Sequence, residues 1–301
     1  MNTPIPFLQP GDLISIVAPA KSIDKELVLN AASFFESKGY QVEIGTNCTG
    51  QFNYFSGTDI ERTADFQKAI DNPNVKAIIC ARGGYGSIRI LDRINWAAFL
   101  RDPKWIVGFS DITVFHQHIQ CMNLPSIHGT MPLNFGENTP EALNSMLDAL
   151  EGRELKVEIP NSTSNKLGKA EGILLGGNLS IIHGLIGTDA QPDYTDSILF
   201  IEDLAEQLYH IDRIFFSLAK AGILDKIKGL IIGGMTDLKD TLVPFGQTIE
   251  EIILSHFEYR KIPIAFNFPA GHIDDNRAMI FGINVSLNVS SDTVYFRSFA
   301  L

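Results

Sequence analysis

The stretch from Lys104 to Ile119 reads KWIVGFSDITVFHQHI, and it indicates the fold class of the chain. Residues 105–107 are a short apolar run that predicts a buried strand. Gly108 interrupts this run, and over residues 111–119 the apolar side chains recur at intervals of three and four, as in a helix. Ser110 therefore lies at a strand-to-helix turn, where a serine either caps the helix or projects as a nucleophile from the edge of a parallel sheet.

The same alternation of strand and helix extends on both sides of this stretch. Alternating strands and helices predict a parallel sheet built from right-handed crossovers. We therefore expect residues 1–159 to form an open parallel-sheet α/β domain that carries Ser110. Its apolar runs and cap residues predict strands at 13–17, 42–44, 76–80, 105–107 and around 127, and helices after 24, 58, 86, 110 and 139.

The second half of the chain follows a polar segment, PNSTSNKLGK, at residues 160–169. Its turn-forming composition predicts a linker between domains. We expect residues 170–301 to form a mixed α+β domain with a strand-rich end. Its patterns predict helices at 178–186, 207–221 and 248–257, and strands at 173–175, 198–201, 230–232, 278–281, 285–289 and 294–296.

Composition excludes several classes of protein. The 301 residues carry a formal net charge of -11, which argues against nucleic acid as a partner because its binding needs a basic face. No apolar run reaches the roughly 18 residues of a membrane span, and the first 20 residues lack the pattern of a signal peptide. The three cysteines suit neither a disulfide framework nor a zinc site. We expect a cytoplasmic protein with no metal, no cofactor and no membrane partner.

A glycine-rich turn, Gly83-Gly84-Tyr85-Gly86, follows one predicted strand and precedes a helix. Such a turn allows backbone N–H groups to approach an anion, so it is either a ligand cradle or a tight structural turn. No Gly-Lys-Ser/Thr follows, and the glycine spacing does not fit the dinucleotide fingerprint. Nucleotide-dependent chemistry is therefore disfavoured.

Two further positions are candidates for chemistry. Glu202 and Asp203 end an apolar strand, where carboxylates either serve a ligand site or favour the start of the next helix. His272 lies in the loop FPAGHIDDN, where it is either a site residue or an ordinary surface histidine. The order Ser…Glu…His occurs in a class of hydrolases, although Ile112 stands where their G-x-S-x-G elbow has its second glycine.

Many ordered motifs together make the chain resemble the LD-carboxypeptidase family of serine peptidases. The motifs span nearly the whole chain: GDLISIVAPA, ARGGYGSIRILDRINW, IVGFSDIT, SIHGTM, LLGGNLS, LFIEDL, YHIDRI, GLIIGG and PAGHIDDNRAM. The resemblance implies a two-domain hydrolase with a catalytic triad between its domains. Matched motif by motif, the triad is Ser110, Glu202 and His272.

The resemblance also implies a substrate, namely a murein tetrapeptide from which terminal D-alanine is released during peptidoglycan recycling. Backbone N–H groups of Asp111 and Gly84 are expected to form the oxyanion hole, and Arg82 with Gly83 to bind the substrate. Family members commonly form homodimers, which is the expectation here. The alternatives are an immunity peptidase that cleaves a peptidyl-nucleotide antibiotic, as microcin C immunity peptidases do, and a non-catalytic protein that binds a small ligand in the same cleft.

Overall fold

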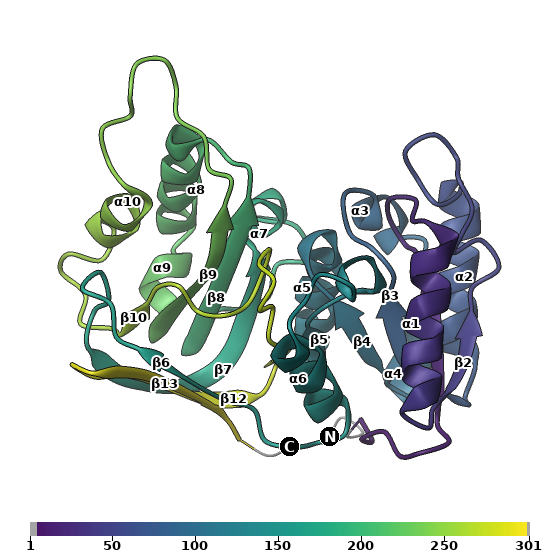
Figure 1. Ribbon diagram of the computed structural model, residues 1–301. Helices are drawn as coiled ribbons and strands as arrows, with labels where there is room; N and C mark the ends of the chain where they lie inside the picture. The colour runs from purple at the N-terminus through teal and green to yellow at the C-terminus, as the bar shows by residue number, and fades with distance from the viewer. Residues whose placement is uncertain (1–4, 300–301) are drawn as a thin grey trace.

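The computed structural model describes residues 5–299, whose strands form two sheets lying side by side (Figure 1). The first sheet has the spatial order β11-β5-β4-β3-β1-β2, and all its pairings are parallel except that of β11 with β5. Its strands are β1 (Leu13–Val17), β2 (Gln41–Ile44), β3 (Val75–Cys80), β4 (Trp105–Gly108), β5 (Ser126–His128) and β11 (Met279–Phe281). This is the open parallel-sheet arrangement expected for the first half.

The second sheet is mixed, with the order β10-β9-β8-β7-β12-β13-β6. From β10 to β7 neighbouring strands run parallel, and from β7 to β6 they run antiparallel. Its strands are β6 (Lys156–Pro160), β7 (Gly168–Asn178), β8 (Ser197–Leu204), β9 (Gly229–Thr236), β10 (Ile264–Ala265), β12 (Asn284–Val289) and β13 (Thr293–Ser298). The predicted fold class, a parallel α/β part followed by a mixed part with a strand-rich end, is confirmed.

Several helices begin at polar residues that the sequence offers as caps. The side chain of Asp24 accepts the N–H of Glu26, and Thr58 forms a capping box with Glu61. The helices are α1 (Lys25–Ser37), α2 (Asp59–Asp71), α3 (Ser87–Leu91), α4 (Ala97–Arg101), α5 (Thr113–Cys121), α6 (Pro140–Leu150), α7 (Leu179–Gly184), α8 (Leu208–Lys220), α9 (Ile223–Lys226) and α10 (Ile249–Ser255), with 3₁₀ turns η1 (Ser110–Ile112) and η2 (Pro132–Asn134).

The two sheets share a hydrophobic core. Val107 on β4, Phe200 on β8 and Phe281 on β11 are fully buried members of one apolar cluster. Helix α5 lies between the sheets in Figure 1, and the side chain of Gln117 on this helix donates to the carbonyl oxygen of Gly176 on β7 at 2.8 Å. The relative position of the sheets is thus held by packing as well as by the chain connection.

Strand membership differs from the expected division of the chain at two places. Strand β6 pairs with β13 in the second sheet, although it precedes the polar segment 160–169. Strand β11, expected at the strand-rich end of the second half, instead pairs antiparallel with β5 at the edge of the first sheet. Both pairings join segments far apart in sequence, which local patterns cannot indicate. The domain bounds 1–159 and 170–301 stay a prediction.

None of the helices within residues 5–299 combines the length and apolar character that crossing a membrane requires.

Candidate active site

Ser110 lies at the sharp turn that follows β4. Its φ angle is 62°, in the left-handed region that costs a residue with a side chain roughly 1–2 kcal/mol. Gly108 permits the turn, because a Cβ atom there would lie 2.9 Å from the side chain of Ile112. Strained conformations of this kind occur at functional sites, where the surrounding structure maintains them. The turn exposes the serine side chain at the carboxyl edge of the first sheet.

Glu202 and His272 approach Ser110 from the second half of the chain. Nε2 of His272 lies 3.2 Å from Oγ of Ser110, and Nδ1 lies 2.5 Å from Oε2 of Glu202. Because an ionised carboxylate only accepts hydrogen bonds, Nδ1 carries the proton in the neutral ring and Nε2 has the free lone pair. This geometry allows the imidazole to remove the hydroxyl proton of the serine.

The loop that carries His272 is pressed against the buried carboxylate. Gly271 has a φ angle of +102°, and a Cβ atom there would lie 2.6 Å from Cβ of Glu202. The N–H of Gly271 donates to Oδ1 of the buried Asn276 at 2.7 Å, and the N–H of His272 donates to Oε2 of Glu202 at 3.2 Å. Backbone contacts therefore help to hold the histidine in place, in addition to the contacts of its ring.

The environment of His272 acts on its pKa in opposite directions. Burial of the ring lowers the pKa, whereas the negative charges of Glu202 and Asp203 and the hydrogen bond to Glu202 raise it. The net direction is upward from the ordinary value of 6.5. The ring of Phe109 packs edge-on against the imidazole, with 4.9 Å between centroids. The carboxylate thus stabilises the imidazolium that forms when the ring accepts a proton.

The glycine turn lies directly beside Ser110. A Cβ atom on Gly83 would lie 3.0 Å from Cβ of Ser110 and 3.2 Å from the backbone nitrogen of Asp111. In the part of the chain that the structure describes, the N–H groups of Gly83, Gly84 and Asp111 donate to no protein acceptor. Free N–H groups beside a nucleophile suit the stabilisation of an oxyanion.

Two polar side chains hold the rim of this turn. Oδ2 of the buried Asp111 accepts the N–H of Ser87 at the start of α3, at 2.7 Å, which ties the helix to the residue after the serine. Burial raises the pKa of Asp111, and hydrogen bonds from Ser87 oppose this effect. Arg82 lines the cleft while its Nη1 donates to the carbonyl oxygen of Ser22 at 2.9 Å.

Comparison with known proteins gives the family. The LD-carboxypeptidase N-terminal domain model matches residues 14–129, and the C-terminal domain model of the same family matches residues 171–287. The chain belongs to the LD-carboxypeptidase family. A putative carboxypeptidase of a Synechocystis species is 32% identical over 97% of this chain and 96% of the relative.

Solved structures agree with this membership. Muramoyltetrapeptide carboxypeptidase from Oxalobacter formigenes, 28% identical, superposes with a TM-score of 0.87 over 95% of this chain and 98% of that chain. The microcin C7 self-immunity protein in complex with aspartyl sulfamoyl adenosine gives a TM-score of 0.85 over 98% of both chains, but at 22% identity this likeness concerns the fold alone. The chain is therefore a member of a peptidase family, and small peptides are the substrates of its named carboxypeptidase relatives.

The cleft of this LD-carboxypeptidase family member has a volume of about 470 Å³. Besides the expected residues Arg82, Gly83, Gly84, Ser110, Asp111 and His272, it is lined by residues to which the sequence analysis assigned no role: Asn178, Ser180, Ile181, Leu204, Glu206, Met131, Leu133 and Asn134. Asn178 and Ser180 belong to the motif LLGGNLS of the family resemblance, so the sequence could have indicated them as residues of the site. Glu206 follows the motif LFIEDL by two residues and had no signal of its own.

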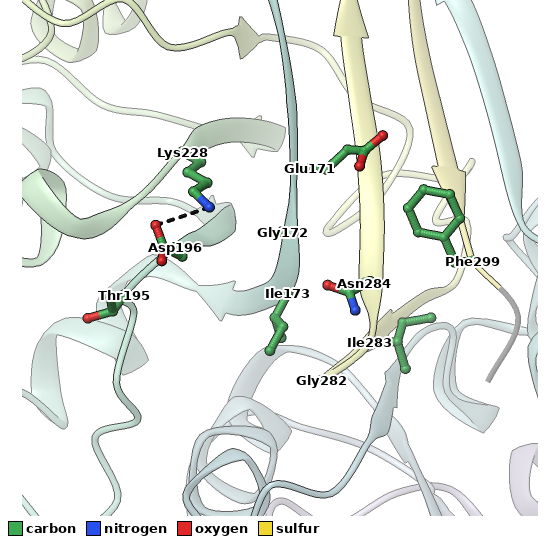
Figure 2. A pocket seen from close by; sticks show the side chains of 10 residues that line it. All are labelled: Glu171, Gly172, Ile173, Thr195, Asp196, Lys228, Gly282, Ile283, Asn284 and Phe299. Carbon is green, nitrogen blue, oxygen red and sulfur yellow. Dashed lines mark ion pairs between the residues drawn. The ribbon is translucent and has the colours of Figure 1, made fainter.

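A larger cavity, of about 700 Å³, is not lined by Ser110. Figure 2 shows the residues that line it. It opens beside Ile173 on β7 and Thr195, which precedes β8, whereas Glu202 stands near the opposite end of β8. Lys228 and Asp196 form an ion pair of 3.1 Å within it. None of its lining residues in the described chain is a serine, cysteine or histidine, so cavity size alone does not locate the chemistry.

Metal ions in proteins are usually held by several histidine, cysteine or carboxylate side chains that lie close together. No group of three or more of them within residues 5–299 is placed to hold a metal ion.

Proposed function

We propose that the protein is a serine-type carboxypeptidase that hydrolyses the L,D peptide bond before the terminal D-alanine of murein tetrapeptide. The observation that carries the proposal is the chain of contacts from Ser110 through His272 to Glu202, with distances of 3.2 Å and 2.5 Å. The family membership and the muramoyltetrapeptide carboxypeptidase of similar fold support the substrate.

The first half of the reaction forms an acyl-enzyme. Oγ of Ser110 attacks the carbonyl carbon while Nε2 of His272 takes the hydroxyl proton, and Glu202 stabilises the resulting imidazolium. The carbonyl electron pair moves to oxygen, where the N–H groups of Asp111 and Gly84 stabilise it. When the tetrahedral intermediate collapses, the C–N bond breaks and His272 gives its proton to the departing amine of D-alanine.

The second half regenerates the serine. His272 removes a proton from a water molecule, the hydroxide adds to the acyl carbon, and the bond to Oγ of Ser110 breaks as the proton returns to it. A carboxypeptidase also needs a cation for the free carboxylate of its substrate, and we assign this task to Arg82, beside Gly83. The N–H groups of Arg82 that do not bind Ser22 are the donors for this contact.

The fold shared with the microcin C7 self-immunity protein supports a second candidate, a peptidase that acts on a peptidyl-nucleotide.

We further propose that the protein is a cytoplasmic homodimer. Cell fractionation and light scattering of the purified chain test these two properties, and a monomer at micromolar concentration would contradict the second.

The decisive experiment is incubation with murein tetrapeptide and, separately, with an aminoacyl sulfamoyl adenosine, followed by mass spectrometry. We expect loss of one D-alanine from the tetrapeptide. Ser110→Ala and His272→Ala should each lower turnover by roughly 10⁴-fold or more, and Glu202→Ala by somewhat less, without loss of the folded state. The double variant at 110 and 272 should be no slower than the worse single variant. Unchanged activity of Ser110→Ala would mean that the serine has no covalent role.

A further inference from the structure

Glu206 stands on the wall of the cleft that contains Ser110 and His272. It lies in the short turn between β8 and α8, and Ala205 before it has a φ angle of 62°. Two backbone hydrogen bonds hold this turn: the N–H of Ala205 donates to Thr236 and the N–H of Lys239 donates to Glu206, each at 2.9 Å. The strained turn is therefore anchored on both sides, which fixes the backbone from which the side chain of Glu206 extends along the cleft wall.

The hydrogen bonds around Glu206 leave one of its oxygens short of a donor. Oε2 pairs with Nδ1 of His210. Oε1 lies 3.1 Å from Oγ of Ser180, but that hydroxyl lies closer, at 2.8 Å, to Oδ2 of Asp203. A hydroxyl has only one proton to donate. We assign it to Asp203, because this carboxylate is only 3% exposed and an unsatisfied charge costs more when it is buried. Oε1 of Glu206 therefore lies next to the hydroxyl oxygen of Ser180 but accepts no hydrogen bond from it.

Asp203 differs from Glu206 because both of its carboxylate oxygens accept two hydrogen bonds each. Its Oδ1 accepts from Nδ2 of Asn178 and from the N–H of Leu204, and its Oδ2 from the N–H and the hydroxyl of Ser180. Glu206 by contrast keeps 24% of its side chain exposed. The cleft thus offers one carboxylate oxygen and one hydroxyl lone pair at adjacent positions, and both can accept hydrogen bonds from an ammonium group.

We propose that Glu206 and Ser180 bind the side-chain ammonium of the diamino acid in the substrate, and that Glu206 makes the enzyme select cationic acyl groups. The inference rests on the proposed peptidase function and specifies its substrate. An ammonium has three N–H donors: one goes to Oε1 of Glu206 and one to Oγ of Ser180. Arg82 and Glu206 then give the cleft one cation and one anion, matching the terminal carboxylate and the ammonium of the tetrapeptide.

This arrangement also separates the two candidate functions. The side chain of an aspartyl group, such as that bound by the microcin C7 self-immunity protein, ends in a carboxylate alone, whereas that of lysine ends in an ammonium and that of diaminopimelate in an ammonium beside a carboxylate. Beside Glu206 a substrate carboxylate meets like charge in a partly enclosed cleft, which disfavours binding. The acidic wall therefore favours the murein substrate over the aspartyl one.

The test uses tetrapeptides with diaminopimelate or lysine at the third position, and twins in which the side-chain amine is acetylated. Binding is measured by calorimetry in a Ser110→Ala background, so that it does not depend on cleavage. We expect the free amine to bind roughly 10- to 100-fold more tightly than the acetylated twin, as for a charge-assisted hydrogen bond. Adding Glu206→Gln should remove this preference, while Glu206→Asp should retain part of it.

The control is Glu258→Gln, which removes the same charge from an exposed position outside the cleft and should leave the preference unchanged. In the cleaving enzyme, Glu206→Gln should raise KM for the free-amine peptide by a similar factor with little change in kcat. A Glu206→Gln variant that still prefers the free amine, or a Ser110→Ala enzyme that binds both twins equally or neither, overturns the subsite. Failure of the wild type to cleave a peptide that it binds through Glu206 instead overturns the peptidase proposal alone.

Discussion

At the scale of single residues, His272 has to be neutral to accept a proton, yet its surroundings favour the charged ring. Burial opposes the charge, and Glu202 together with Asp203 outweighs burial, so that the pKa of His272 lies above its ordinary value of 6.5. A general base with a raised pKa holds its proton up to a higher pH. Activity should therefore fall as the pH is lowered through a value above 6.5.

The acidic limb of the kcat/KM profile should have an apparent pKa above 6.5, and the His272 ring in a Ser110→Ala protein should titrate in the same range by NMR. Glu202→Gln removes the charge that raises the pKa and leaves the burial that lowers it, so the ring should titrate at lower pH in that variant. A titration that stays in place when Glu202 is changed would contradict the assigned cause.

At the scale of elements, the turn between β3 and α3 is shaped to fit the turn after β4. Gly83→Ala places a Cβ atom 3.0 Å from Cβ of Ser110 and 3.3 Å from the carbonyl oxygen of Phe109, so one of the two turns must move by a few tenths of an ångström. Because one turn carries the proposed nucleophile and the other an N–H group proposed to stabilise the oxyanion, we expect kcat to fall by roughly 10- to 100-fold while the melting temperature changes little.

The matched control for this substitution is Gly136→Ala, where an added Cβ atom meets nothing within 4 Å. It should retain full activity in the same assay. A Gly83→Ala enzyme as active as Gly136→Ala would show that the glycine turn is a structural turn only, which is the other interpretation that the sequence left open.

At the scale of the whole molecule, the site is assembled across both sheets. Ser110 follows β4, whereas Glu202 lies on β8 and His272 follows β10, so residues 1–160 alone lack two of the three groups. They also lack β11, which covers the edge of the first sheet beside β5. We expect this fragment to be inactive and less stable than the intact protein.

A full-length chain with a protease site inserted in the polar segment 160–169 allows the associated pieces to be compared with the isolated piece 1–160. After cleavage the two pieces should stay associated and active, because buried residues of both sheets belong to one core. Turnover is assayed before and after separation of the pieces in denaturant. Near wild-type turnover by the isolated piece 1–160 would mean that the triad is misassigned.

The sequence by itself determined most of the local structure and the family. Apolar runs and caps are signals within a dozen residues, and so the predicted strands around Ser110, the cap at Asp24 and the helix Pro140–Leu150 all occur in the structure. The ordered motifs were enough for the family and the fold class, since many short matches in one order seldom arise by chance. They also named Ser110, Glu202 and His272 before any distance between them was known.

Only the tertiary structure gave the contacts between these groups. The contact between Ser110 and His272 joins residues 162 positions apart, and that between Glu202 and His272 joins residues 70 positions apart. The sequence also did not indicate that β11 pairs with β5 in the first sheet, or that Glu206 lies on the cleft wall. Such contacts depend on loop closure and on burial summed over the whole chain, whereas strand and helix patterns reflect energies between near neighbours.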